Sequence, residues 1–149
     1  MRPSPVFLLT SLALTAAACG GDSSGPSDST PSLAGAWSLE ADVSNSGLQV
    51  SCVLTGTVTL TQSGNQFSGQ ASNTSGLCTA PGQSEPFTGD GPLTGGTISG
   101  SQVSYTDGIC TYTGTMSGDP VNRIQGDVSC DFPIQGTDVP MNGSWQLSR

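Results

Sequence analysis

Residues 110–132 read CTYTGTMSGDPVNRIQGDVSCDF, and this stretch decides the fold. On both sides of a turn around Pro120, large or glycine positions alternate with polar ones, which is typical of strands with one buried face. Folding the chain about Pro120 gives three cross-strand pairs: Met116 with Ile124, Tyr112 with Val128, and Cys110 with Cys130. Cross-strand neighbours have Cβ atoms ~4.5–5.5 Å apart, so we predict a hairpin closed by a Cys110–Cys130 disulfide.

Residues 50–71 show the same alternation around a turn at Gly64 and Asn65. A two-residue loop there pairs apolar positions with each other: Leu60 with Gly69, and Val58 with Ala71. Continued further, this register leaves Cys52 one residue short of Cys78, so we predict a Cys52–Cys78 disulfide with a bulge that absorbs one residue. Four cysteines allow three pairings, and only the hairpin registers select this one. Free thiols or a metal site are the weaker alternatives, since no two of the five cysteines are closer than twenty residues.

The remaining segments complete an all-β pattern. Alternation continues in a first strand with Trp37, Leu39, Ala41 and Val43 and in a last strand with Val139, Met141, Trp145 and Leu147. Ile98 and Val103 flank a further turn, and no helical periodicity follows residue 18. We therefore predict an antiparallel up-and-down meander of about eight strands over residues 35–149. Such hairpins close into a barrel or stack as a sandwich, and we favour the barrel.

The chain begins with a targeting segment. Residues 1–18 combine a positive charge at Arg2 with thirteen mostly apolar residues, fewer than the ~20 that a membrane-spanning helix needs. Residues 19–34, which start CGGDSSGPSDSTPS, are predicted to form a flexible tether because they offer almost nothing to bury. Ala16, Ala17 and Ala18 precede Cys19 and Gly20, and this junction resembles the lipobox of bacterial lipoproteins.

The lipobox resemblance implies that Cys19 becomes a lipidated N-terminus. Gly20, rather than an aspartate, follows the cysteine, which in this family implies export to the outer membrane of the cell envelope. Two or three acyl chains hold effectively permanently, because each buried methylene contributes ~0.8 kcal/mol. The alternative is an ordinary cleaved signal peptide with Cys19 as a bystander thiol. With Cys19 assigned to the membrane, an even set of four cysteines remains for the two disulfides.

Two short motifs resemble those of lipocalin-like and avidin-like β-barrels. Gly35-Ala-Trp37 is similar to the G-x-W motif at the start of lipocalins, and Gly143-Ser-Trp145-Gln-Leu147 resembles the closing strand of avidin-like barrels. The resemblance implies that an arginine from the last strand, here Arg149, packs over Trp37. It also implies a barrel interior that takes a small apolar ligand, and we predict its lining as Trp37, Phe67, Tyr112, Phe132 and Trp145. The alternative for the tryptophans is a purely structural role in the core.

Composition excludes several classes of function. The 149 residues contain no histidine and no lysine, which excludes Ser-His-Asp and Cys-His catalysis, histidine metal sites, Schiff-base lysines and P-loops. Three arginines against eleven acidic residues argue against nucleic acid as a partner. Without Arg2 and with an acylated N-terminus, the net charge falls to about −9, so attachment to the membrane depends on the lipid.

The carboxylates do not form a catalytic pattern. The pairs Glu40 with Asp42, and Asp127 with Asp131, alternate outward on their strands, so we predict solvated surface charge rather than a hydrolase. The aspartates at 90, 107 and 119 are predicted as turn residues, and no calcium loop, other metal site or cofactor motif is present.

The sequence therefore favours an exported, lipid-anchored, non-enzymatic β-barrel that binds a small apolar ligand at the cell envelope. The alternative is a structural or adhesive surface module whose polar outer faces or sheet edges contact protein or glycan. An interior with an open mouth favours ligand binding, and an interior filled completely by the aromatic side chains favours the module.

Overall fold

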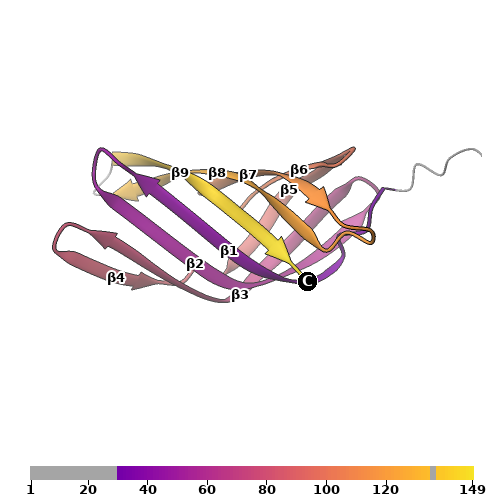
Figure 1. Cartoon of the computed structure of the whole chain (residues 1–149), viewed down its shortest axis with the longest axis horizontal. Helices are drawn as coiled ribbons and strands as arrows, with labels where there is room; N and C mark the ends of the chain where they lie inside the picture. Colours follow the sequence, from indigo (N-terminus) through magenta and orange to yellow (C-terminus); the bar gives the residue numbers. More distant parts are fainter. Residues whose placement is uncertain (1–29, 135–136) are drawn as a thin grey trace, which may run out of the picture.

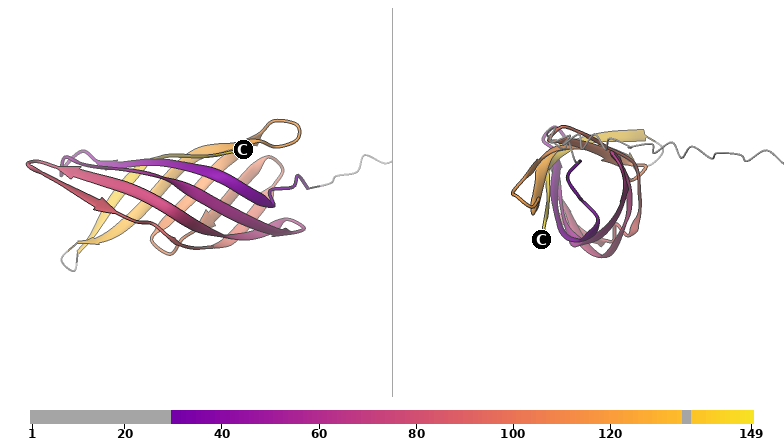
Figure 2. Two further views of the ribbon diagram at one scale, coloured as in Figure 1. Left: turned by 90° about the horizontal axis from the view of Figure 1, so that it is seen from below. Right: turned by 90° about the vertical axis from the view of Figure 1, so that its right-hand side faces the viewer.

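The computed structural model describes residues 30–134 and 137–149, which form a closed antiparallel β-barrel (Figure 1). The strands are β1 Gly35–Asn45, β2 Val50–Ser63, β3 Gln66–Ala80, β4 Gln83–Phe87, β5 Gly91–Ser99, β6 Gln102–Thr106, β7 Cys110–Ser117, β8 Arg123–Ile134 and β9 Thr137–Ser148. Eight of them pair in the ring β2-β1-β9-β8-β7-β6-β5-β3, which a β2–β3 pairing closes. The end-on view in Figure 2 shows this ring. No helix within these two ranges is long and apolar enough to cross a membrane.

This architecture confirms the predicted all-β, up-and-down barrel. Closure comes from β1 and β9, which pair antiparallel from Ser38 with Ser148 to Ser44 with Asn142, so the sheet wraps onto itself instead of forming two stacked layers. The ninth strand, β4, stands outside the ring and pairs only with the far end of β3. It forms an arm at one end of the barrel, visible at the left of Figure 1.

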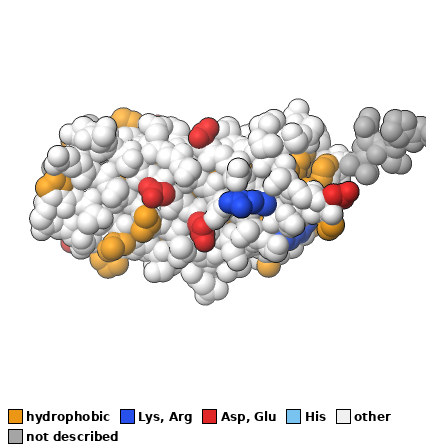
Figure 3. All heavy atoms as spheres, viewed as in Figure 1, with side chains coloured by type: hydrophobic (Ala, Val, Ile, Leu, Met, Phe, Trp, Pro, Cys, Tyr) orange, Lys and Arg blue, Asp and Glu red, His pale blue; other side chains and the backbone are white. Residues whose placement is uncertain are grey.

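Alternating side chains fill the barrel and coat its surface. On β7, residues alternate strictly between buried and exposed along all eight positions, as a strand with one dry face requires. The buried apolar side chains of the described residues form one cluster, and Thr74 is the only buried polar or charged residue among those residues. Figure 3 shows that the face in view is mostly backbone and uncharged side chains outside the hydrophobic class, interrupted by isolated acidic, basic and hydrophobic side chains.

Both predicted hairpin registers and both disulfides are confirmed. In β7–β8, Cys110 lies opposite Cys130 with an S–S distance of 2.01 Å. In β2–β3, the register shifts by one residue between Thr55 and Thr57, so that Cys52 meets Cys78, also at 2.01 Å. Asn73, which belongs to this bulge on β3, adopts a positive φ of 52°, a conformation that asparagine tolerates better than most residues. The bulge is the one-residue adjustment that the cysteine spacing requires.

The barrel has two different ends. The tether end contains the start of β1, the end of β9, and the β2–β3, β5–β6 and β7–β8 turns. The disulfide end contains both disulfides and the β1–β2, β3–β4 and β6–β7 turns. Figure 1 shows the β4 arm at the disulfide end, and the described chain enters at the opposite end.

The tether end is closed by packed side chains. Trp37 and Leu33 are 1% and 0% exposed, and the Trp37 indole donates a hydrogen bond to the Leu33 carbonyl at 2.8 Å. The Arg149 guanidinium lies 4.1 Å from the centre of the Trp37 ring, which is the contact that the lipocalin resemblance implies. Arg149 also donates to the carbonyls of Ser32, Ala34 and Val121. These hydrogen bonds hold Arg149 over Trp37 and Leu33, which together form the plug of the tether end.

The folded domain begins earlier than the predicted boundary at Gly35. The Gln62 side chain accepts a hydrogen bond from the Leu33 amide and donates one to the Pro31 carbonyl. Leu33 is a large apolar side chain that closely follows the polar run of the predicted tether, and it is fully buried. Residues 31–34 therefore belong to the barrel rather than to the tether. The predicted signal peptide, the lipidation site Cys19 and the rest of the tether lie outside the described residues.

Candidate functional site

A cavity of about 130 Å³ lies inside the barrel at the disulfide end. Side chains from β1 through β8 line it, and most of them are apolar. Leu39 and Val43 contribute from β1, and the cysteines 52, 110 and 130 place both disulfides in its wall. Its lining also includes exposed residues of the β4–β5 connection and of the β6–β7 turn, where Ile109 is 49% exposed. The cavity therefore reaches the surface between these two connections.

Four aromatic rings fill the middle of the barrel beneath the cavity. Tyr105 and Tyr112 are cross-strand partners on β6 and β7, and their rings stack with centroids 4.5 Å apart. Trp145 approaches both rings edge-on at 5.2 and 5.6 Å, and Phe67 meets Tyr105 edge-on at 5.9 Å. These offset and edge-to-face geometries are favourable ones for aromatic pairs. The cluster forms the floor of the cavity, because Tyr105 and Tyr112 also line it.

Two glycines allow close packing beside Trp145: Gly114 makes room for its indole, and Gly126 lets β8 approach the backbone of β7 closely. Gly114 on β7 faces Gly126 on β8, which in turn faces Trp145 on β9. A Cβ at Gly126 would lie 2.0 Å from the Thr113 carbonyl oxygen, and one at Gly114 would lie 2.9 Å from the Trp145 ring. The indole can therefore lie against the wall, where its Nε1 donates to the carbonyls of Thr113 and Asp127 at 3.1 and 3.0 Å.

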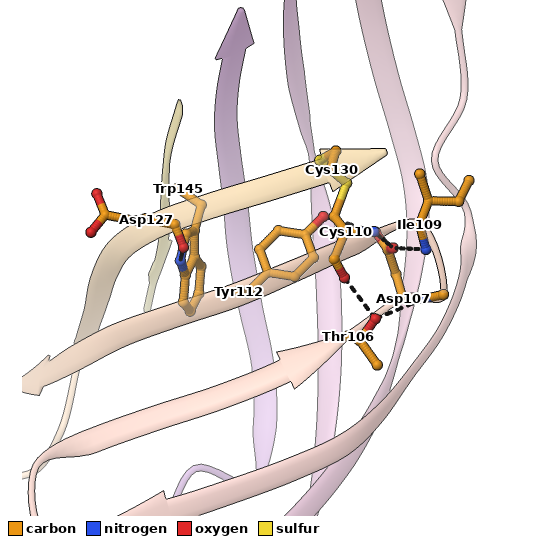
Figure 4. Close-up of a disulfide and its surroundings, with 9 residues drawn as sticks. Thr106, Asp107, Ile109, Cys110, Tyr112, Asp127, Cys130 and Trp145 are labelled. Carbon is orange, nitrogen blue, oxygen red and sulfur yellow. Dashed lines mark hydrogen bonds between the residues drawn. A yellow bond between two sulfur atoms is a disulfide. The ribbon is translucent and has the colours of Figure 1, made fainter. Parts of the chain in front are cut away.

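Asp107 supplies the charge at the cavity mouth. Its Oδ1 accepts hydrogen bonds from the amides of Ile109 and Cys110 at 2.9 and 2.7 Å, which shapes the β6–β7 turn. Its Oδ2 accepts from the Tyr112 hydroxyl at 2.8 Å. Figure 4 shows Asp107 beside Ile109 and Cys110, with the Tyr112 ring between Trp145 and the Cys110–Cys130 disulfide. The turn therefore presents a half-buried carboxylate to an apolar space.

Both tyrosines of the floor are held in their neutral form. Burial is the main reason that the pKa of Tyr105 and of Tyr112 lies well above the ordinary value of 10.0. The nearby Asp107 carboxylate raises both pKa values further, since a tyrosinate beside it would face a like charge. These two hydroxyls are therefore hydrogen-bonding groups of the cavity at neutral pH.

The opposite rim is fixed by a small polar knot. The Asp90 carboxylate accepts hydrogen bonds from the Thr74 amide and hydroxyl at 2.8 and 2.6 Å, and the Thr74 hydroxyl accepts from the Gly89 amide. The hydrogen bonds from Thr74 lower the pKa of Asp90 below its usual value. Next to this knot, Phe87 lies across Gly76, its partner on β3, and lines the cavity. The knot ties the β4 arm to the β3 bulge at the mouth.

The five residues predicted to line the cavity occupy three different places. Tyr112 and Phe132 line it. Phe67 and Trp145 belong to the aromatic cluster beneath, and Trp37 plugs the tether end. The interior is therefore filled at the tether end and in the middle, and hollow at the disulfide end.

Sequence reasoning missed two polar residues of this site. Asp107 was expected only as a turn residue, which it also is, and Tyr105 was not singled out. Tyr105 follows Val103 at the period-two spacing of an inward-facing strand, so its place inside the barrel was readable from the pattern. The carboxylate of Asp107 gave no such signal, because an Asp-Gly pair in a turn is explained without a ligand.

The paired carboxylates lie on the outer surface, as their alternation predicts. Glu40, Asp42, Asp127 and Asp131 are all exposed. The Gln146 side chain links two neighbours across β8, β9 and β1, since it donates to Glu40 and accepts from Arg123. Among the residues that the structure describes, no group of three or more His, Cys, Asp or Glu side chains is placed to hold a metal ion.

Comparison with known proteins adds no family to this picture. No protein family, no curated protein and no solved structure matches the chain. Its site is therefore interpreted from its own geometry.

Proposed function

We propose that this chain is an exported, lipid-anchored protein of the bacterial cell envelope that binds a small apolar ligand inside its barrel. The observation that carries the proposal is the cavity of about 130 Å³, which has mostly apolar walls and a mouth at the end away from the tether. A barrel with a structural role alone gains stability from a filled interior, because an empty apolar space forfeits packing contacts. A cavity that costs stability is explained if a ligand binds in it.

The size of the cavity limits the ligand. An engineered protein cavity of roughly 150 Å³ with apolar walls binds benzene, whereas drug-sized ligands need roughly 300–1,000 Å³. We therefore expect a molecule of one ring or a short aliphatic chain. Long acyl chains exceed this volume.

The proposed location rests on the sequence around Cys19 and on the disulfides. A signal-like segment, a cysteine after small residues and a polar tether are together typical of a lipid anchor. Two disulfides suit an oxidising compartment outside the cytosol. An anchor at Cys19 would place the tether end toward the membrane and the cavity mouth away from it.

Native mass spectrometry of the protein purified from its host envelope tests the binding proposal. We expect a small co-purifying molecule that is lost from an Ala41→Leu variant, because Ala41 lines the cavity and the larger side chain fills it. Protein that carries no ligand in any preparation would contradict the proposal. Metabolic labelling with a palmitate analogue tests the anchor separately, and label that persists in a Cys19→Ala variant would refute it.

A structural or adhesive surface module is the second candidate, and exposed apolar side chains favour it. Val53 and Leu77 are cross-strand partners on the outer face of β2 and β3, and they are 49% and 43% exposed. Leu48 and Ile109 add exposed apolar surface in turns of the same end. A Val53→Ser/Leu77→Ser variant would then lose attachment of cells to their partner, whereas Ala41→Leu would retain it. If ligand binding is the function instead, Ala41→Leu should lose it and the Val53→Ser/Leu77→Ser variant should retain it.

A further inference from the structure

The charge of the cavity has one sign. Among the residues that the structure describes, Asp107 is the only acidic or basic side chain in its lining. The chain has no lysine, and of its three arginines, Arg149 lies at the tether end and Arg123 on the outer face. An anionic ligand, such as a carboxylic acid, would therefore meet a like charge, with neither of the two described arginines near it. A cationic ligand would meet its counter-ion.

Asp107 has room for one more donor. A carboxylate offers about four acceptor positions, and the amides of Ile109 and Cys110 and the hydroxyl of Tyr112 occupy three. A half-buried carboxylate beside an apolar space is costly unless it is paired, and a cationic donor pairs it best. The fourth position is therefore the natural contact for a charged hydrogen-bond donor.

The Tyr105 hydroxyl is a second polar group without a partner. Tyr105 is 4% exposed and lines the cavity, and no hydrogen bond to its hydroxyl is found among residues 30–134 and 137–149. No fully enclosed side-chain polar atom in those ranges lacks a partner, so this hydroxyl still contacts open space. The cavity is the space that its ring lines. Buried polar groups are nearly always hydrogen-bonded, and here a ligand can supply the bond.

Resting on the proposed ligand-binding function, we propose that the cavity takes a small organic cation: a protonated amine on one ring or a short chain. The ammonium group donates to the Asp107 carboxylate and to the Tyr105 hydroxyl. The apolar body contacts Tyr112, Phe87 and Phe132, and the aromatic faces add cation–π attraction.

Three probes of similar size and different charge test this inference on the wild-type domain at pH 7: benzylamine, toluene and benzoate. We expect benzylamine to bind at least tenfold more tightly than toluene, and benzoate not to bind, as measured by NMR chemical-shift titration. Equal affinity for toluene and benzylamine would overturn the cation inference and leave the apolar-ligand function standing. No binding of any probe would overturn both. Shifts confined to the outer groove around Glu40, Asp42 and Asp127 would also overturn the inference, since they report surface charge.

Two variants with matched charge sharpen the test. Asp107→Asn keeps an oxygen for the backbone amides but removes the charge, so we expect at least a tenfold loss of benzylamine affinity and an unchanged toluene affinity. Asp127→Asn removes the same charge from the outer surface and is expected to change neither affinity. Tyr105→Phe should weaken benzylamine several-fold and leave toluene unchanged. It supplies the same test if Asp107→Asn fails to fold. Benzylamine affinity that survives both cavity substitutions would overturn the inference.

Discussion

The two ends of this barrel are stabilised in different ways. At the tether end, Trp37 and Leu33 are fully buried, and Arg149 covers them with hydrogen bonds to three neighbouring carbonyls. At the disulfide end, the interior is hollow, and the walls around the hollow are joined by two covalent cross-links. The tether end is therefore stabilised by side-chain packing, and the disulfide end is stabilised by covalent cross-links around a space without packing.

This difference explains how a small barrel can keep an empty space. Unfilled apolar volume costs stability at roughly 24 cal/mol per Å³ in engineered cavities, so a hollow of this size is a burden of a few kcal/mol. Each disulfide contributes ~3 kcal/mol on a chain-entropy estimate for loops of 26 and 20 residues. The cross-links lie where the packing is weakest, and they offset what a binding site of this kind costs.

Removing one aromatic side chain from each end is expected to give the largest difference between the two ends in the free energy of unfolding. Trp37→Ala is expected to lower the free energy of unfolding by about 3–5 kcal/mol, because it empties a fully packed site. Phe132→Ala should cost only about 1 kcal/mol, since Phe132 is half-buried and already borders the cavity. Chemical denaturation of both variants measures the difference. Equal losses would show that the two ends are packed alike.

Removing the cross-links tests the disulfide end directly. Replacing Cys52 and Cys78 together with alanine, or Cys110 and Cys130 together, should lower the free energy of unfolding by about 3 kcal/mol in each case. Hydrogen exchange should accelerate around the cavity and remain slow around Trp37. Losses below about 1 kcal/mol, or a loosened tether end, would contradict the division between the two ends.

The aromatic floor between the ends predicts a loss of stability at high pH. Burial raises the pKa of Tyr105 and Tyr112 above 10.0, the value they take in the unfolded chain. The contribution of the two tyrosines to stability should therefore be constant below pH 10 and fall above it by about 1.4 kcal/mol per pH unit for each tyrosine. The chain has only these two tyrosines, so absorbance at 295 nm follows them alone. Tyrosinate that forms near pH 10 in the folded protein would contradict a buried floor, and Tyr105→Phe should halve the slope.

A smaller effect than those of Trp37→Ala and of disulfide removal is expected from Arg149, which covers Trp37 and Leu33 at the tether end. Arg149→Met removes the cation–π contact with Trp37 and the hydrogen bonds to Val121 and its neighbours, at an expected cost of about 1–2 kcal/mol. The probe affinities at the disulfide end should not change. The matched substitution Arg123→Met lies on the outer face and should be nearly neutral. A reduced ligand affinity in Arg149→Met would mean that the two ends are coupled.

Local pairing was readable from the sequence because it repeats every two residues. Alternation alone placed Cys110 opposite Cys130, and a mismatch of one residue in the cysteine spacing anticipated the bulge near Thr55. The strand β4 gave no signal, since its first four residues are exposed on both faces and only Phe87 is half-buried, which leaves no buried side to alternate. Alternation along a strand reflects burial, so a strand that buries few side chains, such as β4, shows no alternating pattern.

The cavity was less predictable than the strands around it. Which aromatic side chains meet, as Trp145 meets Tyr105 and Tyr112, depends on closure between β1 and β9, which no local pattern encodes. A void is a difference between the volume of the barrel and the summed volumes of its side chains, so it has no residue of its own in the sequence. For that reason the predicted lining included Trp37, which the fold places at the other end.

Titration of the folded domain with benzene, followed by two-dimensional NMR, tests the central claim most directly. If the disulfide end holds a ligand cavity, resonances of Leu39, Val43 and Val128 should shift with saturable dependence on benzene, while those of Leu33 and Trp37 stay fixed. The Ala41→Leu variant should abolish the shifts. An unchanged spectrum, or shifts that spread equally over both ends, would contradict the account.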